Sequence, residues 1–228
     1  MKLLLASFCL NVLFVTAPLT AATLSGSVRS IVEAIPNAQV VVRSAADGNE
    51  IARLTTDSSG AYQQSFLSPG DYRLQIGAAG FTTVEVRGIH VQSESLSLPP
   101  ILLTLGNQCG STPVVHYLEL LPGQSSQARI SGSVADHTSR KQLQDANVTL
   151  LCQSEPECAA PPRSARGRFS WAVVPGAYKM KIRRKGYFED EYSIFYAQAG
   201  FHTEYDPIYL DRCRGRCLPS QKPPAVCE

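Results

Sequence analysis

The chain has 228 residues, of which 44% are hydrophobic and 18% are charged, and its formal net charge is +2. This length is enough for one large domain or two small ones. The low charged content and ample apolar content argue against an intrinsically disordered chain, and a net charge close to zero disfavours a dedicated nucleic-acid-binding protein.

The first 22 residues have the pattern of a secretory signal peptide. Lys2 supplies the positive start, residues 3–15 form a short apolar stretch, and Thr20-Ala21-Ala22 ends it with small residues. That stretch, like every later one, is shorter than the ~20 apolar residues of a transmembrane helix. We therefore expect a protein that is secreted, either extracellular or periplasmic, and that does not span a membrane.

In chain order, the predicted elements after this segment begin with short strands separated by turns. Residues 40–43 and 82–86 are rich in β-branched side chains, and Tyr72-Arg-Leu-Gln-Ile76 alternates apolar with polar residues, as a strand with one buried face does. Asp47-Gly48-Asn49 and Ser58-Ser59-Gly60 supply the turn residues between them.

Strand patterns continue through the second half of the chain. A strand-like stretch at 114–121 is followed by another at 147–151 and by Tyr178-Lys-Met-Lys-Ile182, which alternates as the earlier strand does. No segment has a convincing 3.6-residue stripe. About seven short strands in each ~80-residue half predict an all-β fold of two tandem Greek-key antiparallel β-sandwiches, of transthyretin-like or immunoglobulin-like type.

An internal repeat supports this division. Leu24-Ser-Gly-Ser-Val28 recurs as Ile130-Ser-Gly-Ser-Val134, and Pro69-Gly-Asp-Tyr72 recurs as Pro175-Gly-Ala-Tyr178, both with an offset of 106 residues. We therefore expect two copies of one domain. The predicted segments are a signal peptide at 1–22, a first domain at 23–105, a linker at 106–127, a second domain at 128–212 and a Cys-containing tail at 213–228.

Between these anchors the offset drifts. It is 108 between Ala38-x-Val40 and Ala146-x-Val148, and 107 between Gly60-Ala-Tyr62 and Gly167-Arg-Phe169. Loop insertions and deletions between strands of fixed length produce small changes in the offset that later cancel.

The anchors of the first copy, taken in order, resemble the carboxypeptidase regulatory-like domain family. They are Gly26-Ser-Val28, Pro36-Asn-Ala-Gln-Val40, Thr56-Asp57, Gly60-Ala-Tyr62, Pro69-Gly-Asp-Tyr72 and Gly80-Phe81. The second copy resembles the family more loosely, because Pro161-Pro-Arg-Ser-Ala-Arg166 replaces the Thr-Asp pair. The resemblance implies a transthyretin-like (prealbumin-like) sandwich. In metallocarboxypeptidases this domain is an accessory to a separate zinc peptidase domain, so the resemblance implies no peptidase activity here.

Six cysteines remain when Cys9 of the signal-like segment is left out, and an even number in a secreted chain predicts up to three disulfides. They are Cys109, Cys152, Cys158, Cys213, Cys217 and Cys227. A bridge between Cys152 and Cys158 is locally reasonable, whereas the tail could close on itself or reach Cys109. A zinc site in the tail is the competing hypothesis, which the lack of a nearby histidine disfavours. We expect no metal and no cofactor.

No catalytic motif accompanies these features. The histidines, His90, His116, His137 and His202, are scattered without metal-ligand spacing. We therefore expect a protein that is not an enzyme and has no catalytic residues. A hydrolase would require His202 or His137 to lie beside a nucleophile in the folded chain.

The second copy combines basic and aromatic residues that could form a ligand-binding face. The candidate residues are Trp171, Lys179, Lys181, Arg183, Tyr187 and Tyr192. The competing interpretation is structural: Glu189 and Glu191 would pair with the cations across a hairpin, and the aromatic rings would fill the core. A flat, exposed aromatic platform would favour sugar binding, and burial of the rings would exclude it.

These observations predict a non-catalytic secreted tandem sandwich that serves as a structural or protein-interaction module. The alternative is a carbohydrate-binding module that uses the candidate face of the second copy, an argument from fold analogy alone. The partner would be a protein or an extracellular glycan, and not a nucleic acid.

Overall fold

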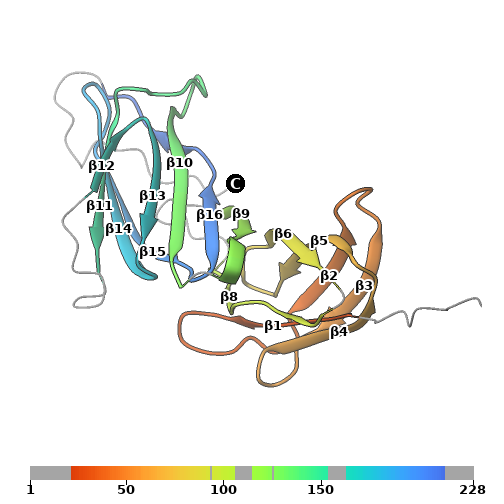
Figure 1. Ribbon diagram of the computed structural model, residues 1–228. Coiled ribbons are helices and arrows are strands. Elements are labelled where there is room, and N and C mark those ends of the chain that lie inside the picture. Colours follow the sequence, from red (N-terminus) through yellow and green to blue (C-terminus); the bar gives the residue numbers. More distant parts are fainter. Residues whose placement is uncertain (1–21, 93, 106–114, 125, 154–162, 214–228) are drawn as a thin grey trace, which may run out of the picture.

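The computed structural model describes residues 22–92, 94–105, 115–124, 126–153 and 163–213. Within these ranges the protein is all-β apart from a 3-10 turn at Pro122–Gln124, and each half of the chain builds one sandwich (Figure 1). No helix in the described part is long and apolar enough to cross a membrane. The predicted fold class, an all-β tandem sandwich, is confirmed.

The first sandwich contains two sheets. Its strands are β1 (Ala22–Arg29), β2 (Gln39–Ser44), β3 (Glu50–Thr55), β4 (Ala61–Leu67), β5 (Gly70–Gly77), β6 (Val84–Val91), β7 (Leu96–Ser97) and β8 (Ile101–Leu102). One sheet has the order β4-β1-β7, with β8 also pairing with β1, and the other has the order β3-β2-β5-β6. The alternation predicted for β5 is present, because Tyr72, Leu74 and Ile76 are buried while Arg73 and Gln75 are exposed.

The second sandwich has the same plan. Its strands are β10 (Ala128–Asp136), β11 (Asn147–Cys152), β12 (Arg163–Arg166), β13 (Arg168–Val173), β14 (Gly176–Arg183), β15 (Asp190–Ala197), β16 (Phe201–Tyr205) and β17 (Ile208–Leu210). The order is β13-β10-β16 in one sheet, with β17 also pairing with β10, and β12-β11-β14-β15 in the other. A tight turn at Gly167 joins β12 to β13 and thereby links the two sheets.

The glycine of the repeated Ser-Gly-Ser anchor is covered by an aromatic ring in both sandwiches. Gly26 pairs across the sheet with Tyr62, and Gly132 pairs with Phe169. A Cβ atom would lie 2.5 Å from Tyr62 Oη in the first case and 2.6 Å from Phe169 Cζ in the second. The two anchors therefore belong together: the ring packs where the glycine has no side chain.

The tyrosine of the repeated Pro-Gly-x-Tyr anchor lies two residues inside a strand that begins at the glycine, and its side chain is buried. Its hydroxyl also bonds to the turn before the strand. Tyr72 Oη donates a hydrogen bond to the carbonyl oxygen of Ser68, and Tyr178 Oη donates to that of Val174, both at 2.7 Å. A buried tyrosine needs such a partner for its hydroxyl.

A strand within the predicted linker joins the two sandwiches. β9 (Val115–Leu120) pairs in parallel with β6 and antiparallel with β16, so one continuous sheet runs from β3 to β15 (Figure 1). Leu118 of this strand is completely buried. The strand predicted at 114–121 is present, and it is a member of both sandwiches.

Hydrogen bonds from side chains reinforce this junction. The side-chain amide of Gln198 accepts a hydrogen bond from the Leu102 N–H at 2.9 Å and donates one to the Leu102 carbonyl at 3.2 Å. The guanidinium of Arg87 lies 4.2 Å from the centre of the Tyr117 ring, and the Tyr117 hydroxyl donates to Glu204. Residues of both sandwiches thus contact one another directly.

Candidate functional site

The three cations of the predicted ligand face lie on the outward side of β14. Lys179 pairs with Glu191, while Lys181 Nζ and Arg183 Nε lie 2.8 Å and 2.6 Å from the Glu189 carboxylate. Hydrogen bonds from Arg183 and then Lys181 lower the pKa of Glu189, as an ion pair does. The structural interpretation predicted that Glu189 and Glu191 pair with these cations across the hairpin, and the pairs are present. The positive charge of this face is therefore largely compensated.

The predicted aromatic residues do not join these cations on one face. Trp171 lies on β13, half-buried, and stacks on the buried Phe169 ring at 5.0 Å between centroids. Tyr187 is only 8% exposed and points into the protein. The side chain of Tyr192 lies outside the described residues. The expectation of a single aromatic and basic face is corrected, because alternation along β13 turns Trp171 toward the core side while the cations of β14 face outward.

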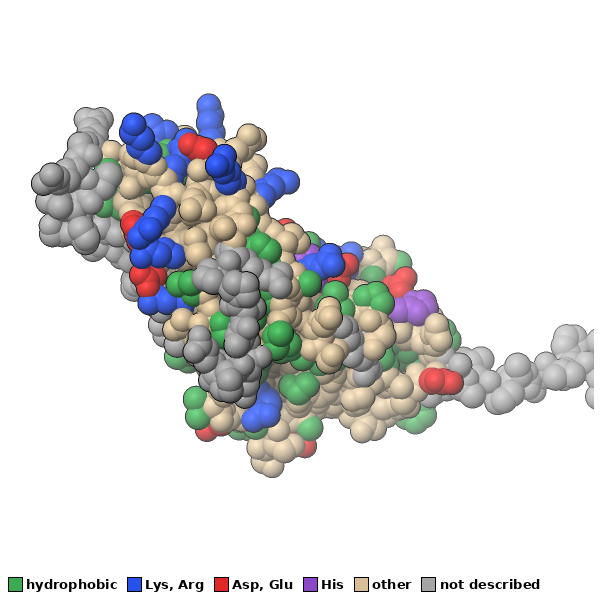
Figure 2. All heavy atoms as spheres, turned by 60° about the vertical axis from the view of Figure 1, so that its left-hand side comes forward, with side chains coloured by type: hydrophobic (Ala, Val, Ile, Leu, Met, Phe, Trp, Pro, Cys, Tyr) green, Lys and Arg blue, Asp and Glu red, His purple; other side chains and the backbone are tan. Residues whose placement is uncertain are grey.

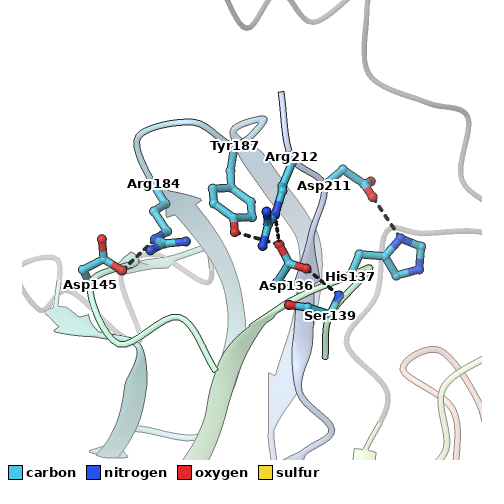
Figure 3. A network of polar contacts seen from close by, with 8 residues as sticks. All are labelled: Asp136, His137, Ser139, Asp145, Arg184, Tyr187, Asp211 and Arg212. Carbon is cyan, nitrogen blue, oxygen red and sulfur yellow. Dashed lines mark hydrogen bonds and ion pairs between the residues drawn. The ribbon is translucent and has the colours of Figure 1, made fainter. Parts of the chain in front are cut away.

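Tyr187 instead belongs to a buried polar network at one end of the second sandwich (Figure 3). The Asp136 side chain is 1% exposed and accepts hydrogen bonds from Arg212 Nε, from the Ser139 N–H at 2.6 Å and from Tyr187 Oη at 2.7 Å. These donors, Arg212 first, hold the pKa of Asp136 well below its usual range. Burial, followed by the bond to Asp136, raises the pKa of Tyr187.

Further pairs surround this network. Arg184 Nε lies 2.6 Å from Asp145 Oδ1, and its guanidinium stacks on Tyr187 at 4.7 Å (Figure 3). His137 Nδ1 lies 2.9 Å from Asp211 Oδ1. The carboxylates at this end are thus each paired with a side chain of the protein itself. The arrangement fastens the chain after β17 to the end of β10 and offers no free acid or base.

Asp136 and Arg212 were not predicted as site residues, although the repeat contains a signal for Asp136. The anchor Gly80-Phe81 of the first copy recurs as Gly186-Tyr187, so the second copy adds a hydroxyl at a core position. A buried hydroxyl requires a partner. With the 106-residue offset, Ser30 corresponds to Asp136, which supplies that partner.

A second polar cluster meets the geometric condition stated above for a hydrolase. Ser131 Oγ lies 2.8 Å from His202 Nε2, and His202 Nδ1 lies 3.5 Å from Glu119 Oε2. The surroundings differ from those of a hydrolase, however. β10 is a central strand that pairs with β13 and β16, so its backbone N–H groups serve the sheet and cannot form an oxyanion hole above Ser131. Glu119 is also about half-exposed.

The groove beside Ser131 recurs in the first sandwich. It measures about 540 Å³ over Ser131 and Ser133, and the counterpart over Ser25 and Ser27 measures about 510 Å³. Neither groove has a histidine among its described lining residues. Because the groove recurs in both sandwiches, it is a product of the repeated fold, and we interpret the Ser131 cluster as structural hydrogen bonding between β10 and β16.

Two of the six cysteines lie within the described residues. Cys152 and Cys213 are both disulfide-bonded, which argues against Cys213 as a zinc ligand. The other four cysteines, Cys109, Cys158, Cys217 and Cys227, lie outside the described residues, so the pairing stays a prediction. The described residues contain no group of three or more metal-ligating side chains.

Comparisons with known proteins give one family match. Residues 23–98 match the family model of the carboxypeptidase regulatory-like domain. The match covers the first copy only, so membership of the second copy in this family stays a prediction. No curated protein matches the chain.

Solved structures with matching segments share little sequence with the chain. The TIE protein of Bacillus anthracis is 13% identical over 83% of this chain and 34% of its own, with a TM-score of 0.31. A type II cohesin–X-dockerin complex from Acetivibrio cellulolyticus is 21% identical over 39% and 60%, with a TM-score of 0.32. BcpA, the major pilin subunit of Bacillus cereus, is 9% identical over 85% and 100%, with a TM-score of 0.30. The chain thus spans about a third of the first of these proteins and three fifths of the second.

No functional conclusion follows from structural matches at this level. The anchors that resemble a known family, their geometry in the folded chain and the family match agree on the same segment. The first sandwich, over residues 23–98, is similar to the carboxypeptidase regulatory-like domain.

Proposed function

We propose that the protein is a non-catalytic, secreted module that holds two β-sandwiches in a fixed relative orientation and serves a structural or protein-interaction role. The observation that supports this most directly is the double pairing of β9 with β6 and β16. A flexible tether would let two domains move independently. A strand that pairs with both sandwiches holds them in one relative orientation.

Separation of the sandwiches would be costly. It would expose Leu118, whose burial contributes about 1.5–3 kcal/mol. It would also break the two hydrogen bonds of Gln198, each contributing about 0.5–1.5 kcal/mol, and leave a strand edge unpaired. These contributions favour one rigid body that presents the loops of both sandwiches at a constant distance.

The secreted location is supported by two independent features. The first 22 residues have the composition of a signal peptide. Cys152 and Cys213 are disulfide-bonded, which is typical of oxidising compartments outside the cytosol. Sugar binding through the Trp171–Tyr187 face is not proposed, because Tyr187 is buried and Trp171 is stacked on Phe169.

Residual dipolar couplings of the oxidised chain test the fixed orientation. We expect the amides of both sandwiches to fit one alignment tensor. Leu118→Asp, which places a charge in the buried junction, should yield two tensors, whereas the exposed neighbouring change Glu119→Gln should leave one. Two independent tensors in the unchanged protein would contradict the proposal.

A further inference from the structure

The loops at one end of the second sandwich concentrate positive charge. Lys and Arg side chains gather at the top of the view in Figure 2, over the second sandwich. We call this surface the basic end and define it by Arg140, Lys141, Arg166, Arg168, Arg184, Lys185 and Arg212. We propose that the basic end binds an acidic polysaccharide, a partner class that goes beyond the proposed structural role.

These residues come together because the ends of several strands meet there. Arg140 and Lys141 follow β10, Arg166 and Arg168 flank the turn between β12 and β13, and Lys185 follows β14. The backbone of Gly167 accepts a hydrogen bond from the Val134 N–H, which fixes the hairpin tip beside the loop that follows β10. The tip has no room to move toward that loop, since a Cβ on Gly167 would lie 2.5 Å from Gln144 Cα.

Most of this charge is not compensated by carboxylates of the described chain. Arg184 pairs with Asp145, and Arg212 with Asp136. The remaining cations are exposed and form no ion pair with any described residue; they are Arg140, Lys141, Arg166, Arg168 and Lys185. The cations of β14, by contrast, already face Glu189 and Glu191.

The position of Arg140 is fixed before any ligand arrives. Its backbone has a φ of 57°, in the left-handed region that costs a non-glycine residue about 1–2 kcal/mol. Its guanidinium lies 4.3 Å from the centre of the Tyr209 ring. Pre-positioned arginine forks suit the paired oxygens of carboxylate and sulfate groups.

The charge belongs to the second copy and not to the fold. At the corresponding end of the first sandwich, the loops 30–38, 57–60 and 78–83 contain Glu33 and Asp57 and no lysine or arginine. The offset of 108 at Ala38 and Ala146, against 106 at the strand before, means that the second copy has two more residues in the loop of Arg140 and Lys141.

The surroundings of these cations favour a polysaccharide over the other polyanions. On the described part of the second sandwich, Val174 is the one large apolar side chain that is exposed. It precedes β14 and so lies at the end opposite the basic end. Among the described residues, the basic end therefore has no exposed large apolar side chain to insert into a lipid surface. The aromatic rings at the basic end are covered: Tyr187 is buried, and Tyr209 lies under Arg140, so no platform for stacked bases is formed. Charge is the property left for recognition, which fits a linear chain with repeated sulfate or carboxylate groups.

Titration with a heparin oligosaccharide tests the proposal. The test variant combines Arg140→Gln, Lys141→Gln, Arg166→Gln and Arg168→Gln. The matched control removes the same charge from the first sandwich through Arg29→Gln, Arg43→Gln, Arg53→Gln and Arg73→Gln. Because each cation near an anionic surface contributes on the order of a few-fold in affinity, we expect the test variant to lose at least about tenfold. The control should change affinity by less than about twofold.

Three results would overturn the proposal. The first is the absence of saturable heparin binding at about 0.15 M salt. The second is an equal loss of heparin affinity in the control variant. The third is equally tight binding of single-stranded DNA or of phosphatidylserine vesicles that depends on the same cations. Neutral dextran should not bind. Circular dichroism of each variant checks that it is folded. Failure here leaves the dipolar-coupling test of the rigid module unaffected, because that test involves no anion.

Discussion

Asp136 illustrates how one residue can connect the ends of a domain. Its carboxylate receives donors from three separate segments: the loop after β10, the turn before β15 and the chain after β17. The nearby pair between Arg184 and Asp145 differs, because the Asp145 side chain is 67% exposed. Buried charged hydrogen bonds contribute far more to stability than exposed pairs do.

The lowered pKa of Asp136 predicts a dependence of stability on pH. A carboxyl group with a depressed pKa in the folded state adds stability that is fully present above its unfolded pKa, close to 3.8, and is lost as the pH falls toward the folded value. Asp136→Asn should therefore lower Tm at pH 7 by about 5–10 °C, and the difference from the unchanged protein should shrink below about pH 4. Melting curves followed by circular dichroism between these pH values measure it.

Asp145→Asn is the matched control. It removes a carboxylate from an exposed pair and should shift Tm by less than about 2 °C. A difference between Asp136→Asn and the unchanged protein that stays constant down to pH 3 would show that the lost stability comes from packing and not from the charge.

At the level of elements, the two sandwiches differ by one residue in the strand that carries the covered aromatic ring. Ala22 pairs with Leu67 and Leu24 with Gln64, so two steps along β1 match three along β4. The extra residue produces a bulge at which Phe66 has a φ of 64° and is 85% exposed. β13 pairs with β10 without a register shift.

Strain at this bulge is predicted to be measurable. A bulky residue in the left-handed region costs about 1–2 kcal/mol, which glycine avoids. Phe66→Gly should therefore raise the free energy of unfolding in urea by roughly 0.5–1.5 kcal/mol, since the exposed ring contributes little packing. Ser65→Gly, one residue earlier, should lower it. A loss of stability in Phe66→Gly would mean that the ring packs on a neighbour.

The strands were more predictable from the sequence than the contacts between residues that are far apart in the chain. The strands of both copies, the buried tyrosine strands and the pairing of Glu189 and Glu191 with the β14 cations follow from alternation and hairpin geometry. The offset drift located loops of different length. The hydrogen bond between Tyr187 and Asp136 did not follow, because the two residues are 51 positions apart in the chain. The second pairing of β9 likewise has no local signal, since the sequence pattern of a strand is the same whether the strand pairs with one neighbour or with two.

At the scale of the whole molecule, the shared strand β9 should couple the unfolding of the two sandwiches. The fully buried residues form one cluster that extends from β1 through Leu118 to β17. In a tandem array with soft linkers each unit unfolds by itself, whereas a large common interface couples the units. The coupling can be measured in this chain because its single tryptophan, Trp171, lies in the second sandwich.

A core truncation in the first sandwich should therefore destabilise the second. Leu74 of β5 is completely buried, and Leu74→Ala should cost about 2–5 kcal/mol. We expect the transition reported by Trp171 fluorescence to fall by about 10 °C, together with the far-ultraviolet circular dichroism transition. Leu105→Ala, at an exposed position of the same sandwich, should leave both transitions in place. If Leu74→Ala lowered the circular dichroism transition while the Trp171 signal kept its midpoint, β9 would be a contact between independently stable domains, and the fixed orientation would have to come from elsewhere.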